Sequence, residues 1–151
     1  MVQTVQLIHD YPYPASRVWQ VVTDLDRLRE VTAGLLAFRN LPSGQIRAGQ
    51  VLEVEVSLFG RLPYQPYRME VEALDAAAMT FQSDETGAGV ETWRHHLRVV
   101  PTATGCRVEE RIEIAAWFAT PIFALWARGL YRARHKPRLQ ILAASTEADK
   151  A

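Results

Sequence analysis

The sequence lacks the features that would tie it to an oxidising compartment, a membrane or a polyanion. Its 151 residues include one cysteine, Cys106, so no disulfide can form within the chain. The longest uncharged stretch, residues 114–127, contains a proline and is too short to cross a bilayer. Seventeen basic residues balance seventeen acidic ones, so no overall charge attracts nucleic acid. Since the first residues also lack a signal-peptide pattern, we expect a cytoplasmic protein without a nucleic-acid partner.

Motifs for cofactors, metals and covalent catalysis are also missing. The sequence has no glycine-rich phosphate loop, no nucleophile elbow and no serine or cysteine with a plausible triad. His95 and His96 are adjacent on a predicted strand and point to opposite faces, while His9 and His135 are far away in sequence. We therefore expect no cofactor and no metal. This absence of motifs favours binding over catalysis.

What is present is the composition of an ordinary globular domain. Hydrophobic residues make up 48% of the chain and charged residues 23%, and a chain of this length can bury a sizeable core. We expect a single domain over residues 1–145, followed by a disordered tail over residues 146–151.

Alternation of apolar and polar residues with period two predicts strands along much of the middle of the chain. Two short helices, from about Pro14 and from Asp24 to about Val31, separate the first strand from the rest. A longer helix extends from Thr120 to about Ser145. The pattern predicts an α+β fold in which a curved antiparallel sheet of about seven strands wraps around the C-terminal helix. The strands are expected at residues 4–10, 36–41, 52–58, 67–73, 79–83, 91–100 and 106–114.

Charge predicts the register of the last two strands. If Pro101 pairs with Cys106, Arg98 lies opposite Glu109, whereas a slip of two residues would set it against Arg107. The first register avoids opposing like charges, so we expect it.

The same register brings two ionisable side chains together on an otherwise apolar inner face. Glu110 then lies opposite Leu97 and diagonal to His95. A carboxylate on an apolar face is costly unless it is paired, and the histidine is the nearest partner. Two interpretations stay open. The pair is structural, or it faces a ligand as a polar anchor or an acid/base pair.

The long helix has a clear start and a flaw in its second half. Thr120 suits an N-cap and Pro121 the first helical position. Pro137 removes the bond to the Ala133 carbonyl and should kink or break the helix. Basic residues gather in the second half and are interpreted as a solvated helix end: Arg128, Arg132, Arg134, Lys136 and Arg138. The expected core-facing residues are Ile122, Leu125, Trp126, Gly129, Leu130 and Ala133.

Aromatic residues around the start of this helix exceed what one core-facing stripe can bury. Trp117, Phe118 and Phe123 are the candidates for exposure. Such a patch predicts a homodimer contact, or transient docking on an anionic membrane helped by the basic residues further along the helix.

Four local patterns resemble one bacterial branch of the helix-grip superfamily, also called SRPBCC. They are the Val-Trp helix at residues 14–19 with Asp24 after it, the Trp-x-His strand at residues 93–95, the strand at residues 105–112 and the aromatic-Arg-x-Arg pattern at residues 131–135. The superfamily includes START lipid-transfer domains, birch-pollen allergens, polyketide cyclases and coenzyme Q-binding proteins. The resemblance implies a seven-stranded sheet with a ligand cavity against the last helix, and no single function.

The expected function is binding or transport of a small, largely apolar ligand, such as a lipid, an isoprenoid quinone or an aromatic metabolite. The cavity should then measure roughly a few hundred Å³. The alternatives are a cyclase or aromatase that uses His95 and Glu110 as acid and base, and an interaction protein with a filled cavity. The candidate ligand-binding residues are Val54, Val56, Tyr67, Met69, Val71, Phe81, Trp93, His95, Leu97, Glu110, Trp126 and Leu130.

Overall fold

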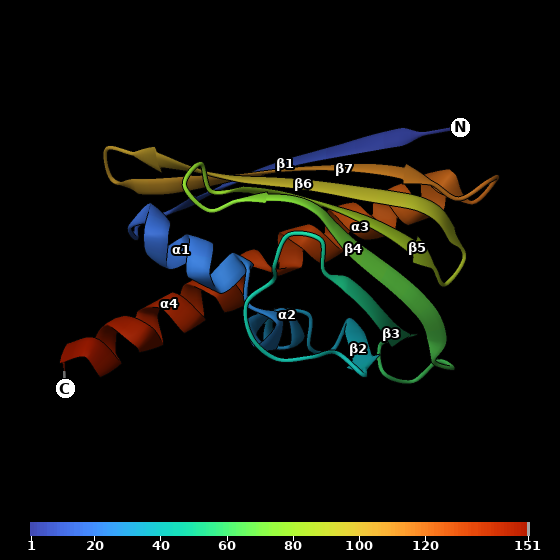
Figure 1. Ribbon diagram of the computed structural model, residues 1–151, viewed down its shortest axis with the longest axis horizontal. Helices are drawn as coiled ribbons and strands as arrows, with labels where there is room; N and C mark the ends of the chain where they lie inside the picture. The colour runs from blue at the N-terminus through green and yellow to red at the C-terminus, as the bar shows by residue number, and fades with distance from the viewer. Residues whose placement is uncertain (151) are drawn as a thin grey trace.

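One curved antiparallel sheet packs against the first of the two C-terminal helices, and the second lies against the two short helices (Figure 1). The computed structural model describes residues 1–150, in which seven strands pair in the order β1-β7-β6-β5-β4-β3-β2. The α+β helix-grip fold expected from the sequence is confirmed. The elements are β1 (Gln3–Tyr11), α1 (Ala15–Val22), α2 (Leu25–Val31), β2 (Leu36–Arg39), β3 (Val51–Leu58), β4 (Gln65–Asp75), β5 (Thr80–Gly87), β6 (Val90–Thr102), β7 (Gly105–Ala115), α3 (Thr120–Ala133) and α4 (His135–Lys150).

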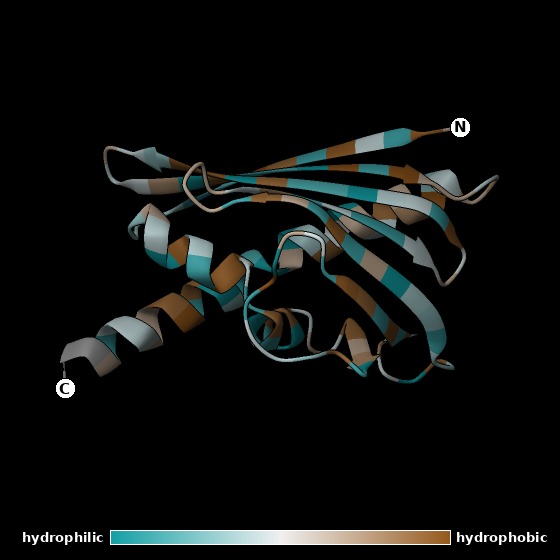
Figure 2. Ribbon diagram, viewed as in Figure 1, coloured by the Kyte–Doolittle hydropathy of each residue, from teal (hydrophilic) through white to brown (hydrophobic). Residues whose placement is uncertain are grey.

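The helices all lie on the concave side of the sheet (Figure 1). Helix α3 packs on β1 and β7, α1 packs on β6 and β7, and α4 contacts both α1 and α2. The Arg17 guanidinium donates to the Thr146 hydroxyl at 2.8 Å and ties α1 to α4. Figure 2 shows apolar and polar residues alternating along the strands, as expected for a sheet with one buried face.

The predicted register of the β6–β7 hairpin is confirmed. Pro101 pairs with Cys106, and Arg98 lies opposite Glu109. The hairpin turn is tighter than expected, because the strands continue to Thr102 and Gly105. A Cβ atom at Gly105 would lie 2.1 Å from the Tyr11 carbonyl oxygen, so only glycine allows β1 to approach this closely.

The long helix is broken into α3 and α4 at Arg134, between Ala133 and His135. Pro137 lies in the first turn of α4, where its missing N–H leaves the Ala133 carbonyl without the helical bond that a continuous helix would need. The break therefore follows from the proline. At the other end the N-cap is Ala119 rather than Thr120.

The core-facing stripe predicted for this helix is partly wrong. Ile122 and Leu125 are 72% and 73% exposed. The residues of α3 that bury against the sheet are Thr120, Ala124, Ala127, Leu130 and Tyr131. Small alanines allow the helix to approach β1 closely, and Ile122 and Leu125 lie on the opposite side of the helix.

Residues 146–150, expected to be a disordered tail, continue α4 as helix, and Ala151 lies outside the described residues. None of the helices within residues 1–150 combines the length and the hydropathy that a membrane span needs.

Candidate functional site

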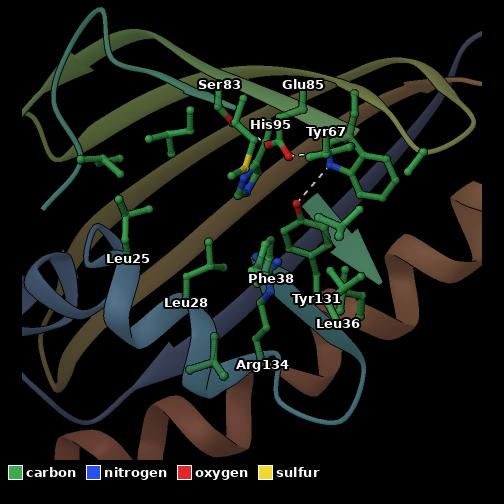
Figure 3. A pocket seen from close by; sticks show the side chains of 18 of the residues that line it. Leu25, Leu28, Leu36, Phe38, Tyr67, Ser83, Glu85, His95, Tyr131 and Arg134 are labelled. Carbon is green, nitrogen blue, oxygen red and sulfur yellow. Dashed lines mark hydrogen bonds between the residues drawn. The ribbon is translucent and has the colours of Figure 1, made fainter. Parts of the chain in front are cut away.

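A cavity of about 190 Å³ lies between the concave face of the sheet and helices α2 and α3 (Figure 3). Leu58, at the end of β3, and Leu62, in the next loop, are 38% and 50% exposed and form part of its rim. The cavity is smaller than the sequence led us to expect. Ring side chains narrow it: Phe38, Tyr67, Phe81, Trp93, Phe123, Trp126 and Tyr131.

Most of the predicted ligand-binding residues line this cavity. Two do not. Val54 is buried with Leu25 and Leu41, where the curled end of the sheet meets α2. Glu110 lies behind His95 instead of facing the cavity. The predicted residues that do line it are Val56, Tyr67, Met69, Val71, Phe81, Trp93, His95, Leu97, Trp126 and Leu130.

Glu110 is the centre of a buried charge cluster. Its Oε2 lies 2.8 Å from His95 Nε2, and its Oε1 accepts a hydrogen bond of 3.0 Å from Arg138 Nη1. His95, Glu110 and Arg138 are 5%, 3% and 4% exposed. The diagonal pair inferred from the hairpin register is therefore present, with an arginine of α4 as a third member.

The electrostatics of this cluster keep the carboxylate ionised. Burial alone would raise the pKa of Glu110, but the Arg138 guanidinium and the hydrogen bond from His95 outweigh it and hold the pKa well below its usual range. Burial likewise opposes the charge on Arg138, and Glu110 more than compensates, so the pKa of Arg138 is raised. Because Glu110 stays charged and faces away from the cavity, it can orient His95 but cannot itself exchange protons with a ligand.

An aromatic cluster positions His95 at the cavity wall. The His95 ring contacts the edge of Tyr131 at a centroid distance of 4.9 Å and of Phe81 at 5.5 Å. Trp93 Nε1 donates to the Tyr131 hydroxyl at 3.2 Å, the contact drawn as a dashed line in Figure 3. Burial raises the pKa of Tyr131, so this hydroxyl stays protonated.

A second carboxylate, Glu85 of β5, reaches the cavity from the sheet. The Tyr67 hydroxyl donates to its Oε1 at 2.9 Å and the Ser83 hydroxyl to its Oε2 at 2.8 Å. Burial, and then the neighbouring Glu85 charge, raise the pKa of Tyr67 well above its usual value. Tyr67 therefore remains a hydrogen-bond donor to the carboxylate.

Two arginines of the last helices were wrongly interpreted as solvated. Arg134 and Arg138 are 7% and 4% exposed, and both line the cavity. The Arg134 guanidinium lies 4.2 Å from the centroid of the Tyr131 ring. Their spacing in the sequence could have indicated this burial. The two arginines lie on one helical stripe with Leu130 and Leu142, at intervals of four residues, and all four residues are buried.

Comparison with known proteins identifies the family. A family model described as Domain of unknown function (DUF8410) matches residues 11–141. The chain belongs to the DUF8410 family. None of the curated proteins matches it.

Solved structures share the fold of this DUF8410 domain at low sequence identity. A protein from Thermus thermophilus is 15% identical with a TM-score of 0.73, covering 95% of this chain and 99% of its own. Norcoclaurine synthase from Thalictrum flavum, in complex with dopamine and hydroxybenzaldehyde, is 15% identical with a TM-score of 0.69, covering 95% and 88%. An aromatase/cyclase from a Streptomyces species is 14% identical with a TM-score of 0.66, covering 100% and 97%. The resemblance to the helix-grip superfamily is confirmed at the level of the fold.

Other titratable side chains among residues 1–150 lie outside the cavity, and they include a pair of histidines and the cysteine. His9 and His135, far apart in sequence, stack with ring centroids 4.7 Å apart. Residues 1–150 contain no group of three or more histidine, cysteine, aspartate or glutamate side chains that could hold a metal ion. Burial raises the pKa of the Cys106 thiol to about 11, so the thiol is unreactive.

Proposed function

We propose that this protein binds, in the cytoplasm, a small and largely apolar molecule between the sheet and the last helices. The observation that carries the proposal is the cavity itself, whose walls are mainly apolar and aromatic with a few convergent polar groups, Glu85, His95 and Arg134. This is the usual lining of a small-molecule site. Norcoclaurine synthase, which shares the fold, holds dopamine and hydroxybenzaldehyde, two small aromatic molecules.

The volume favours the smallest of the three ligand classes. An apolar cavity of about 150 Å³ is known to accept benzene. At about 190 Å³, this cavity suits a substituted single ring better than a lipid chain or a polycyclic polyketide. We therefore propose an aromatic metabolite as the ligand.

Calorimetric titration with a neutral single-ring probe, 4-ethylbenzamide, tests the proposal. The wild-type protein should bind it, and Val71→Trp, which fills the cavity from β4, should abolish binding. Ile8→Trp is the control, because Ile8 is 62% exposed on β1 and does not line the cavity. The absence of binding to the wild type, or equal binding to Val71→Trp, would reject the proposal. If the wild type binds the probe, mass spectrometry of material extracted from the native protein would identify the natural ligand.

A catalytic role is a second candidate, and one observation favours it. His95 lines the cavity while Glu110 holds its Nε2 from behind at 2.8 Å, which is how carboxylates orient histidines that act as acid or base. In this version His95 alone would exchange protons with the substrate. His95→Gln should then abolish turnover of a bound substrate while leaving its affinity within a few fold.

We also propose that the exposed start of α3 contacts a second copy of this chain. Trp117, Phe118, Ile122 and Leu125 are 63%, 94%, 72% and 73% exposed, whereas Phe123 turns inward to the cavity. The chain has no net charge to draw it to an anionic bilayer, and apolar patches of this kind mark interaction sites. A homodimer is therefore favoured over a membrane.

A further inference from the structure

Arg134 is a buried cation that has no carboxylate of its own. Its residue is 7% exposed, and its Nε is buried without a hydrogen-bond partner among residues 1–150. The guanidinium contacts the face of Tyr131, with its Cζ atom 4.2 Å from the ring centroid. Figure 3 shows the side chain reaching from the last helices toward the cavity, beside Tyr131.

The nearby carboxylates are already in use. Glu110 is held by Arg138 and His95, at 3.0 and 2.8 Å. Glu85 accepts from Tyr67 and Ser83 on the sheet side of the cavity. Arg134 therefore differs from Arg138, which lies four residues further on and makes a direct ion pair in the protein itself.

This arrangement is costly unless something else completes it. Burying part of a guanidinium away from water without an anion carries a desolvation penalty. A cation–π contact with one tyrosine offsets only part of it. Because the guanidinium lines the cavity, an occupant of the cavity can supply the missing acceptor.

We infer that the ligand is an organic acid, a small aromatic or apolar molecule whose carboxylate pairs with Arg134. This inference rests on the proposed binding function and specifies its ligand class. The planar guanidinium can hold a carboxylate through two parallel hydrogen bonds. The Glu85 carboxylate on the sheet side repels an acid group, so the ligand enters with its acid toward the helices and its ring toward the sheet.

A matched pair of probes tests the charge alone. We would measure by calorimetry the binding of 4-ethylbenzoate and of 4-ethylbenzamide, which share one ring and one alkyl group. The wild-type protein should bind the acid at least about ten-fold more tightly, because a hydrogen bond between two charged groups is stronger than one to a neutral amide. Arg134→Gln should bring the ratio of the two affinities close to one, because the neutral side chain no longer distinguishes the acid from the amide. Arg132→Gln, an exposed arginine on the same helix, should keep the preference.

The outcomes separate this inference from the function on which it rests. If the amide does not bind the wild type, the proposed function fails. If the amide binds but the acid binds no better, or if the preference survives in Arg134→Gln, the function stands and the acid ligand is rejected.

Thermal stability gives a second readout that needs no ligand. If Arg134 serves a ligand, Arg134→Met should melt at or above the wild-type temperature, because it removes an unpaired buried charge. Arg138→Met should melt well below it, because it strands Glu110. A comparable loss in both variants would show that Arg134 is structural and would overturn the inference.

Discussion

At the scale of single residues, Glu110 shows how one carboxylate can hold two elements together. One oxygen binds His95 on the neighbouring strand, and the other binds Arg138 on the last helix. An ion pair inside the apolar core therefore joins strand β7 of the sheet to helix α4. Such a pair adds little over an apolar substitute, but breaking it is expensive because one charge is left behind.

Glu110→Gln should lower the free energy of unfolding by about 3–5 kcal/mol, since it leaves Arg138 buried without its anion. His95→Ala should cost a few kcal/mol as well. The double variant should cost less than the sum, because both changes disrupt one network. Urea unfolding measures all three. Asp10→Asn is the control, since Asp10 pairs with Arg107 on the surface and should stay within about 0.5 kcal/mol of wild type. Additive losses would show that His95 and Glu110 are not coupled.

The stacked pair of His9 and His135 predicts acid sensitivity. Burial lowers the pKa of both, and for His135 the neighbouring His9 adds to this. The charges of Glu110 and Asp10 raise the pKa of His9 in part, and Arg138 and Arg132 lower it further. For His135, Asp10 raises the pKa in part and Arg138 lowers it further. Below the unfolded histidine pKa of about 6.5 the unfolded state binds more protons, so the unfolding free energy should fall as the pH drops.

Urea unfolding at pH 7.5 and pH 5.5 measures this loss. His135→Phe keeps a stacked ring and removes one titrating group, so its loss should be smaller. Part of the loss in stability should persist in this variant, because burial also lowers the pKa of His96 on the outer face of the sheet. Glu110 stays ionised throughout this window and does not contribute. An unchanged or larger loss in the variant would contradict the prediction.

At the scale of elements, the turn between β7 and α3 depends on one hydroxyl. Thr120 Oγ1 accepts from the Ala116 N–H at 2.9 Å and donates to the Trp117 carbonyl at 2.7 Å. Trp117 has a φ of 47°, an uncommon conformation for a bulky residue. The hydroxyl therefore fixes the turn that projects Trp117 outward.

Thr120→Ala should destabilise the protein by about 1–3 kcal/mol, because it removes the acceptor of the Ala116 N–H and one of the two donors to the Trp117 carbonyl. Thr120→Ser keeps the hydroxyl and should lose less than half as much. Thermal and urea unfolding of the two variants check this. Equal losses would assign the effect to the threonine methyl group instead.

The elements differ in how well the sequence predicts them. In β6 and β7 the alternation and the opposed charges of Arg98 and Glu109 fix both the face and the register, because strand pairs interact locally. In α3 the same reasoning failed, since Ile122 and Leu125 are apolar yet exposed. Hydrophobicity identifies residues that favour burial, but it does not say which side of a helix packs on the sheet. In the described structure these two residues lie on the side that does not.

At the scale of the whole molecule, that uncovered surface predicts self-association. Sedimentation velocity should show a concentration-dependent dimer that Phe118→Ser dissociates, since Phe118 is 94% exposed and its replacement leaves the core intact. Ile8→Ser, on exposed β1, is the control. A monomer that instead sediments with anionic liposomes, and loses this binding in Phe118→Ser, would assign the surface to a membrane.

Separation along the chain explains which residues of the site could be predicted from the sequence and which could not. The cavity walls on the sheet, such as Met69 and Trp93, follow from period two, and His95 with Glu110 follows from the hairpin register. Arg138 could not be paired in advance, because its partner Glu110 is 28 residues earlier and no local rule relates the two elements. Val54 shares the inner face with Leu52 and Val56, which line the cavity, but its own side chain is buried in the core cluster with Leu25 and Leu41.

The break at Arg134 places two buried arginines with different roles on either side of the junction between α3 and α4. Arg138, on α4, secures the fold through Glu110, and Arg134, at the end of α3, faces the cavity. Under the proposed function, a lineage could therefore exchange Arg134 for a neutral or acidic residue and change which molecules bind, while Arg138 keeps the fold. Ligand specificity in this domain could then diverge through single substitutions that leave the descendants able to fold.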